Sequence, residues 1–103
     1  MNDYISILKK DLLHVIDILI EKNIVNQSFI KDNLTIDYLS KSKQGDISTN
    51  LFILLNSHLN KKNYDLQKIV YENICNFEYI QKVEITKIGF INIALQQKIN
   101  HQL

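Results

Sequence analysis

Near its C-terminal end the chain places an aromatic ring and a carboxamide at a spacing that could read a nucleobase. Phe90 and Asn92 alternate with three aliphatic residues, Ile91, Ile93 and Leu95. Successive side chains of a strand point to opposite faces, so if the aliphatic residues fill a core, Phe90, Asn92 and Ala94 share the other face. A ring for stacking beside a hydrogen-bonding amide is how proteins usually recognise an unpaired RNA base.

Both side chains also have an ordinary structural interpretation. Phe90 could instead fold over the end of a hairpin and cover the core, and the sequence leaves both positions open. Asn92 could be a solvent-facing strand residue, since a polar residue among isoleucines must face water or find a partner. Stacking of one base on one ring contributes roughly 1–3 kcal/mol, which allows discrimination within a larger complex but not tight binding alone.

No group of residues predicts catalysis or metal binding. The chain has two glycines and no glycine-rich phosphate loop, and no Ser/His/Asp or Cys/His arrangement has local support. His14 and His58 fall in predicted helices without further ligands at metal-binding spacing, so we predict no metal site. The single cysteine, Cys75, lies in an apolar-periodic segment and is predicted to be a buried, reduced thiol.

Two polar residues and four lysines are further candidates. Asp46 and Asn50 could suggest acid chemistry, but their setting favours structural roles: Asp46 bonding the backbone of its own turn, and Asn50 fixing a strand-to-helix corner. The lysines fall at predicted strand ends and turns, where they are either phosphate contacts or simply solvated charges. They are Lys41, Lys43, Lys82 and Lys87.

The composition limits the class of protein. With 103 residues and 46% hydrophobic residues, the chain can bury one modest core and is expected to fold as one unit. The formal net charge is +1, so any RNA contact must be local. All 12 basic residues are lysines, which cannot make bidentate phosphate contacts. No apolar stretch is long enough to span a membrane and charged residues lie near the N-terminus, so we expect a cytoplasmic protein without a membrane partner.

Hydrophobic periodicity predicts the elements that position these residues. A three-to-four spacing predicts helices over about residues 3–22, 51–60 and 66–77. Alternation predicts strands over 34–38 and 46–48 and a terminal hairpin of 80–85 and 91–95, joined by Thr86–Gly89. Ser48 or Thr49 is expected to cap the second helix, and Asn63 or Asp65 the third. The order α-β-(β)-α-α-β-β predicts an α+β, two-layer domain, with helices packed on one face of a small, mainly antiparallel sheet.

Two segments together carry a family resemblance. They are Gln44-Gly45-Asp46-Ile47-Ser48-Thr49-Asn50 and Val83-Glu84-Ile85-Thr86-Lys87-Ile88-Gly89-Phe90-Ile91-Asn92-Ile93. By their order, spacing and N-terminal position the chain resembles the N-terminal additional domain of bacterial arginyl-tRNA synthetases, from the first helix to about Leu95. That family has a Gly-Asp element ending in Asn that opens a helix, and a closing Gly-Phe-Ile-Asn strand preceded by Val-Glu-Ile.

The resemblance implies that the domain binds tRNA, contacting the D-loop at the outer corner of the molecule. Phe90 and Asn92 would recognise an exposed base, and Lys87 would contribute beside them. The family usually has Gly-Pro where this sequence has Lys87-Ile88, so we expect a different hairpin connection. The resemblance places the ATP and arginine sites in a separate catalytic domain of the parent enzyme, so no cofactor and no catalysis are expected of this chain alone.

The same resemblance implies a domain plan and partners. Residues 1–95 would form the tRNA-binding domain, and residues 96–103 a tail or the start of a linker to the catalytic domain. The partners would be tRNA and that catalytic domain, and not DNA. The alternative function is a freestanding protein-interaction module without catalysis, which would use the same sheet face or a helix groove.

Overall fold

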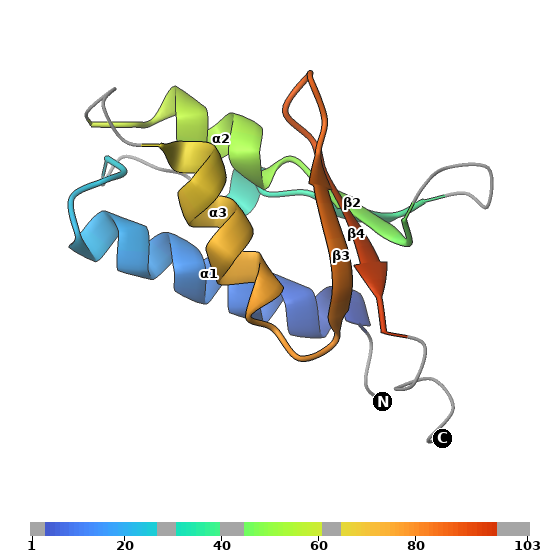
Figure 1. Cartoon of the computed structure of the whole chain (residues 1–103). Coiled ribbons are helices and arrows are strands. Elements are labelled where there is room, and N and C mark those ends of the chain that lie inside the picture. The colour runs from blue at the N-terminus through green and yellow to red at the C-terminus, as the bar shows by residue number, and fades with distance from the viewer. Residues whose placement is uncertain (1–3, 27–30, 40–44, 61–64, 97–103) are drawn as a thin grey trace.

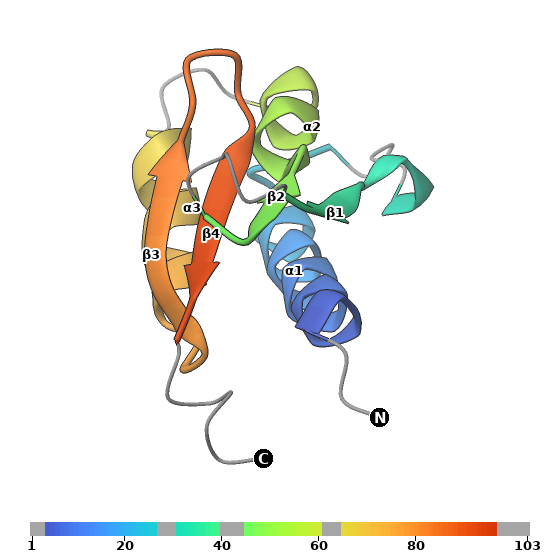
Figure 2. The same cartoon turned by 90° about the vertical axis from the view of Figure 1, so that its right-hand side faces the viewer.

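Three helices cover one face of a four-stranded sheet in the computed structural model (Figures 1 and 2), which describes residues 4–26, 31–39, 45–60 and 65–96. The helices are α1 (Tyr4–Glu21), α2 (Leu51–Ser57) and α3 (Leu66–Cys75), with a short 3-10 turn, η1, at Lys31–Asn33. The strands are β1 (Ile36–Tyr38), β2 (Ile47–Thr49), β3 (Ile80–Ile85) and β4 (Ile91–Leu95). The predicted α+β, two-layer fold and its element order are confirmed.

The sheet is antiparallel throughout, with the strand order β1-β2-β4-β3. The C-terminal strand β4 therefore lies inside the sheet, where Ile93 pairs with Ile47 on one side and Val83 on the other. A bulge at Gln81 shifts the register of β3. It allows Ile80 and Val83 to be buried on the same face although they are three residues apart.

The core lies between the helices and the inner face of the sheet. Helix α1 contributes residues spaced by three or four, and β4 contributes alternate residues, as their periods require. The buried residues of these two elements are Leu8, Leu12, Val15, Ile16, Leu19, Ile91, Ile93 and Leu95. The described helices all lie on this inner face, and no described element covers the other face of the sheet. None of the described helices has the length and hydropathy needed to cross a lipid bilayer.

Helix α2 differs from its predicted form at both ends. It ends at Ser57 rather than near Asn60, because the following residues pair with the segment after α1, where Asn26 N–H donates to the His58 carbonyl and Asn60 N–H to the Ile24 carbonyl. At its start, the N-cap residue is Asn50, without a side-chain capping bond. Thr49 Oγ1 accepts a weak 3.3 Å bond from Leu51 N–H.

The prediction that Cys75 is buried is wrong. Cys75 is exposed at the C-terminal end of α3, because the inward positions of that helix are taken by Leu66, Val70 and Ile74. The next residue after Ile74 is turned about 100° away around the helix axis. On the exposed side, a hydrogen bond with Cys75 raises the pKa of the Tyr71 phenol. At the other end of α3 the predicted cap Asp65 is confirmed, since its side chain accepts a bond from Lys68 N–H.

Asp46 and Asn50 both have structural roles, but Asp46 not in the predicted way. Its Oδ2 accepts a 2.8 Å bond from Leu95 N–H at the far end of β4, and among the described residues it makes no bond to its own turn. Asn50 fixes the corner between β2 and α2, as predicted. Its Oδ1 accepts a 2.8 Å bond from Thr35 N–H, and its amide donates to the Asn33 carbonyl at 3.0 Å.

The Tyr79 phenol connects the start of the hairpin region to helix α1. Its hydroxyl donates a 2.5 Å hydrogen bond to Asp11 Oδ2, and its ring stacks on Phe77. Burial, followed by the bond to Asp11, raises the pKa of Tyr79 far above its ordinary value of 10.0. The stability that this phenol contributes is therefore fully present below pH 10, the pKa of the tyrosine in the unfolded chain. It is lost progressively as the pH rises from there towards the higher pKa of the folded state.

We expect Tyr79→Phe to lower the free energy of unfolding by about 1–2 kcal/mol at pH 7, because a hydrogen bond to a carboxylate is lost. Urea denaturation at pH 7 and pH 10.5 measures the effect. The difference between wild type and variant should shrink at the higher pH, where the unfolded tyrosine ionises. Tyr71→Phe is the control at pH 7, where the bond of this exposed phenol with the exposed Cys75 is open to solvent, and it should leave stability within about 0.5 kcal/mol. An undiminished difference at pH 10.5 would contradict the assignment.

Candidate nucleic-acid interface

The sheet face turned away from the helices, called the open face below, carries polar side chains in register across all four strands. Asn92 on β4 pairs directly with Ser48 on β2 and Glu84 on β3, and Ser48 pairs in turn with Asp37 on β1. Along β4, Asn92 and Ala94 are partly exposed between buried neighbours. The face assignment predicted for Asn92 and Ala94 is confirmed, and the open face is turned toward the viewer in Figure 2.

Phe90 is held on this face by the hairpin turn that precedes it. Its N–H donates to Thr86 Oγ1 at 3.0 Å, while its carbonyl accepts from Thr86 N–H at 2.8 Å. The turn is closed by Gly89, whose N–H donates to the Thr86 carbonyl and whose φ is +98°, a conformation that favours glycine. The connection is Thr86–Phe90, one residue longer than predicted. Thus Thr86 fixes the backbone of Phe90, the residue that carries the aromatic ring.

An aromatic hollow lies on the open face beside this turn. The ring of Phe90, 36% exposed, and the amide of Asn92 both line it. The described residues of its lining are Leu39, Ser48, Thr86, Ile88, Phe90 and Asn92. Of the two positions that the sequence left open for Phe90, the structure therefore shows the one on the open face. The hollow combines a ring with apolar side chains, a hydroxyl and an amide, which suits a flat base with polar edges.

The amide of Asn92 is half-buried and makes no hydrogen bond within the described segments. Since a partly desolvated amide gains free energy from any partner, this group is available to a ligand. It can donate through its nitrogen and accept through its oxygen. Ser48, which pairs with Asn92 from β2, adds a hydroxyl that can also donate and accept hydrogen bonds.

A second, charged hollow adjoins the first and shares Asn92 with it. Lys82 and Glu84 of β3 form one side, and Ala94 and Gly45 leave the floor without large side chains. The two hollows thus lie on either side of the Asn92 side chain. Gly45 has a φ of +97°, and a Cβ there would lie 3.3 Å from the Ile93 carbonyl oxygen, so the floor of the hollow also requires glycine.

The structure brings Phe90 and Asn92 together but does not place Lys87 in either hollow. Lys87 is exposed on the turn beside Ile88, which is 75% exposed. Of the other candidate lysines, Lys82 lines the charged hollow, whereas Lys41 and Lys43 lie outside the described residues. Sequence reasoning missed Leu39 and Ser48, because it could not place β2 beside β4 and β1 on the far side of β2. The exposed apolar residue Ile88 in a turn was a signal that could have been noticed.

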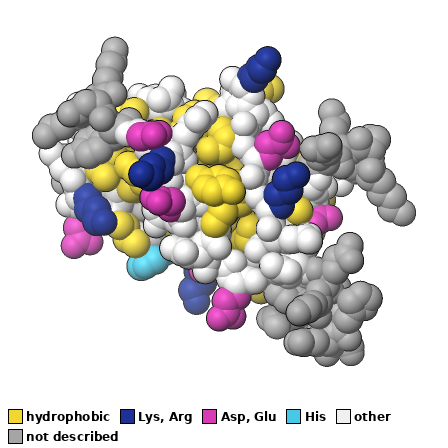
Figure 3. Space-filling model, viewed as in Figure 1, with side chains coloured by type: hydrophobic (Ala, Val, Ile, Leu, Met, Phe, Trp, Pro, Cys, Tyr) yellow, Lys and Arg dark blue, Asp and Glu magenta, His cyan; other side chains and the backbone are white. Residues whose placement is uncertain are grey.

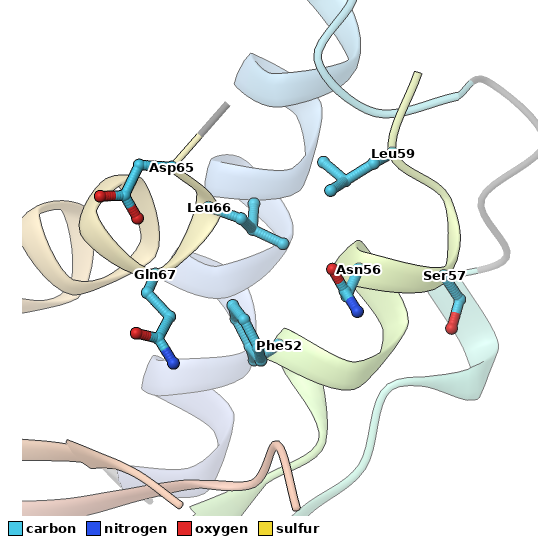
Figure 4. A pocket seen from close by; sticks show the side chains of 7 residues that line it. All are labelled: Phe52, Asn56, Ser57, Leu59, Asp65, Leu66 and Gln67. Carbon is cyan, nitrogen blue, oxygen red and sulfur yellow. The ribbon is translucent and has the colours of Figure 1, made fainter. Parts of the chain in front are cut away.

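A larger hollow lies elsewhere, between α2 and the start of α3 (Figure 4). It is lined by Phe52, Asn56, Ser57, Leu59, Asp65, Leu66 and Gln67. Asp65, the one charged side chain among the described residues of this lining, already caps α3. No residue that the sequence singled out for binding lies here, so the open face is the better candidate.

On the face shown in Figure 3, the charges of the described residues do not mark a second nucleic-acid site. On the side shown in Figure 3, lysine side chains are scattered among acidic ones over the helices and do not form a basic patch. Across residues 4–26, 31–39, 45–60 and 65–96, no group of three or more His, Cys, Asp or Glu could hold a metal ion. The chemistry available on the open face is therefore recognition by stacking, hydrogen bonds and isolated charges.

The chain is similar to known proteins along most of its length. A family model described as the arginyl tRNA synthetase N terminal domain matches residues 6–95. The chain is 29% identical over 92 residues to an arginine–tRNA ligase of Ehrlichia chaffeensis, covering 88% of this chain and 16% of that protein. It is 34% identical over 77 residues to the arginine–tRNA ligase of Buchnera aphidicola subsp. Baizongia pistaciae, covering 73% and 13%. The chain spans about one sixth of the length of the first relatives.

Proposed function

Since the chain belongs to the family of arginyl-tRNA synthetase N-terminal domains, we propose that it binds tRNA, and that it does so with the open face of its sheet. An unpaired base of the D-loop occupies the aromatic hollow, stacked on Phe90 and hydrogen-bonded by Asn92. Lys87, exposed on the neighbouring turn, contacts a phosphate on the turn side of that base as a point charge.

The observation that carries the proposal is the half-buried amide of Asn92, which has no hydrogen-bond partner among the described residues, beside the exposed ring of Phe90. Recognition of RNA sequence generally targets unpaired bases, whose faces stack and whose edges are free to bond. A loop of tRNA supplies such bases. The net charge of +1 fits a contact of this local kind, in which few phosphates are bound.

The parent protein is proposed to be an arginine–tRNA ligase, as the relatives named above are. In it, the catalytic domain that binds ATP and arginine would be the second partner of this chain, and the domain would contribute affinity for tRNA rather than chemistry. Roughly 1–3 kcal/mol from one stacked base is a useful supplement to the contacts of a larger enzyme.

The test is a titration of the isotopically labelled 103-residue chain with a bacterial arginine tRNA at low salt, followed by NMR amide shifts. We expect shifts to cluster at residues 86–94. Phe90→Ala should weaken binding by about 1–3 kcal/mol, at least fivefold in Kd, because the stacking surface is lost. Asn92→Ala should weaken it by about 1 kcal/mol.

Tyr71→Ala is the matched control, because Tyr71 is an exposed aromatic residue on α3, away from the open face. It should leave the affinity unchanged. Unchanged affinity in Phe90→Ala and Asn92→Ala, or shifts that cluster on the helices, would contradict the proposed surface. A titration without any shift would contradict tRNA binding by this chain on its own.

A further inference from the structure

The charged hollow contains two charged side chains, Lys82 and Glu84, that take no part in the proposed recognition of the base. It adjoins the aromatic hollow through Asn92, and its side chains come from β3, the neighbour of β4 on the side away from β2. Glu84 lies directly opposite Asn92, and Lys82 directly opposite Ala94. The sugar and phosphate next to a base held by Asn92 would therefore lie close to a carboxylate and an ammonium group.

Neither of these charges is neutralised by the described part of the protein. Glu84 and Lys82 are both exposed and project from the same face of β3, yet they make no ion pair with each other or with another described residue. The small residues Ala94 and Gly45 beside them leave room for a ligand. Both charged groups are thus available to a ligand that offers a hydrogen-bond donor and an anion side by side.

A carboxylate on a tRNA-binding face needs a specific explanation, because it repels phosphate. An ionised carboxylate only accepts hydrogen bonds, so its partner must be a donor. The ribose of RNA has such a donor, the 2′-hydroxyl, which DNA lacks. A phosphate follows each ribose along the chain, and Lys82 provides its counter-charge.

We propose that Glu84 and Lys82 form a ribose–phosphate subsite, in which Glu84 accepts a hydrogen bond from a 2′-hydroxyl and Lys82 contacts the adjoining phosphate. The subsite makes the domain distinguish RNA from DNA. This inference rests on the proposed function, since it requires that a base occupies the aromatic hollow.

The experiment compares two synthetic hairpins with the 103-residue chain by NMR titration. One hairpin has the D-arm sequence of a bacterial arginine tRNA, and the other has 2′-deoxyribose throughout its loop. Wild type should bind the RNA loop about tenfold more tightly, as a hydrogen bond to a charged group predicts. In Glu84→Ala this ratio should fall to about one. In Lys82→Ala both hairpins should bind more weakly, and the salt dependence should decrease by about 0.7 in log–log slope.

Glu72→Ala is the matched control, because Glu72 is an exposed glutamate on α3, in the helical layer. It removes the same charge and should leave the ratio at about ten. A ratio that stays the same in Glu84→Ala, or a wild-type ratio near one, overturns the subsite while Phe90→Ala still tests the base site. If the wild-type chain binds neither hairpin, the proposed function fails and the subsite fails with it.

Discussion

Gly89→Ala should lower the free energy of unfolding by about 2–5 kcal/mol. Two costs add at this position. An alanine at a φ of +98° is strained by roughly 1–2 kcal/mol, and its Cβ would lie 2.6 Å from Cγ1 of Ile53 on α2, where overpacking typically costs 1–3 kcal/mol. For a domain of this size the melting temperature should fall by roughly 10–25 °C, measurable by circular dichroism.

Gly45→Ala separates the two costs. Gly45 has nearly the same φ, +97°, but its added Cβ would be 3.3 Å from the nearest atom, the Ile93 carbonyl oxygen. The loss should therefore be about 1–2 kcal/mol, from backbone strain. In addition, Ile53→Ala should relieve part of the Gly89→Ala defect, so that the double variant loses less than the sum of the single ones. Equal losses at the two glycines would show that the hairpin turn is not seated on α2.

Ile93→Ala should cost about 2–5 kcal/mol, because it empties a fully buried site in an interior strand. Its neighbour Asn92 faces the other way, so Asn92→Ala should change stability by no more than about 0.5 kcal/mol. Urea denaturation of the two variants measures the difference. The pair tests the central geometric claim, that adjacent residues of β4 serve the core and the open face.

A similar loss of stability in both variants would mean that Asn92 has a structural partner and is not available to a ligand. The binding experiment would then be expected to show no specific role for its amide. If the expected difference is found, any loss of tRNA affinity in Asn92→Ala can be ascribed to the surface, because the fold is retained.

Periodicity in the sequence was enough to predict most of the elements. Helix α1, predicted over about residues 3–22, spans Tyr4–Glu21, and the hairpin strands have their predicted bounds. Both depend on local patterns of apolar residues, which burial against a single core enforces. The predicted alternation was less reliable in β1, where Tyr38 is 58% exposed. This short edge strand has few neighbours to bury its side chains.

The errors and omissions concern contacts between distant segments. Cys75 was taken for a buried residue because its segment is apolar, but helix geometry turns it outward next to Ile74. The bond from Leu95 N–H to Asp46 spans 49 residues and could not be read from a local turn motif. In the same way, Phe90 and Asn92 could be proposed from one strand, whereas Ser48 and Glu84 became neighbours of Asn92 only once the strand order was known.

The interior position of β4 has a consequence for how the protein is made. Ile47 on β2 can pair with β4 only after Ile93, 46 positions later in the chain, has been synthesised. Pairings between such distant residues form slowly. During synthesis, β2 and β3 emerge from the ribosome before the strand that joins them. Until β4 arrives, each has an unpaired edge that could pair with another nascent chain. Asn92, proposed to bind the edge of a base, is thus on the strand that joins β2 to β3. A chain in which β4 has not yet paired therefore lacks the assembled open face and does not compete for tRNA.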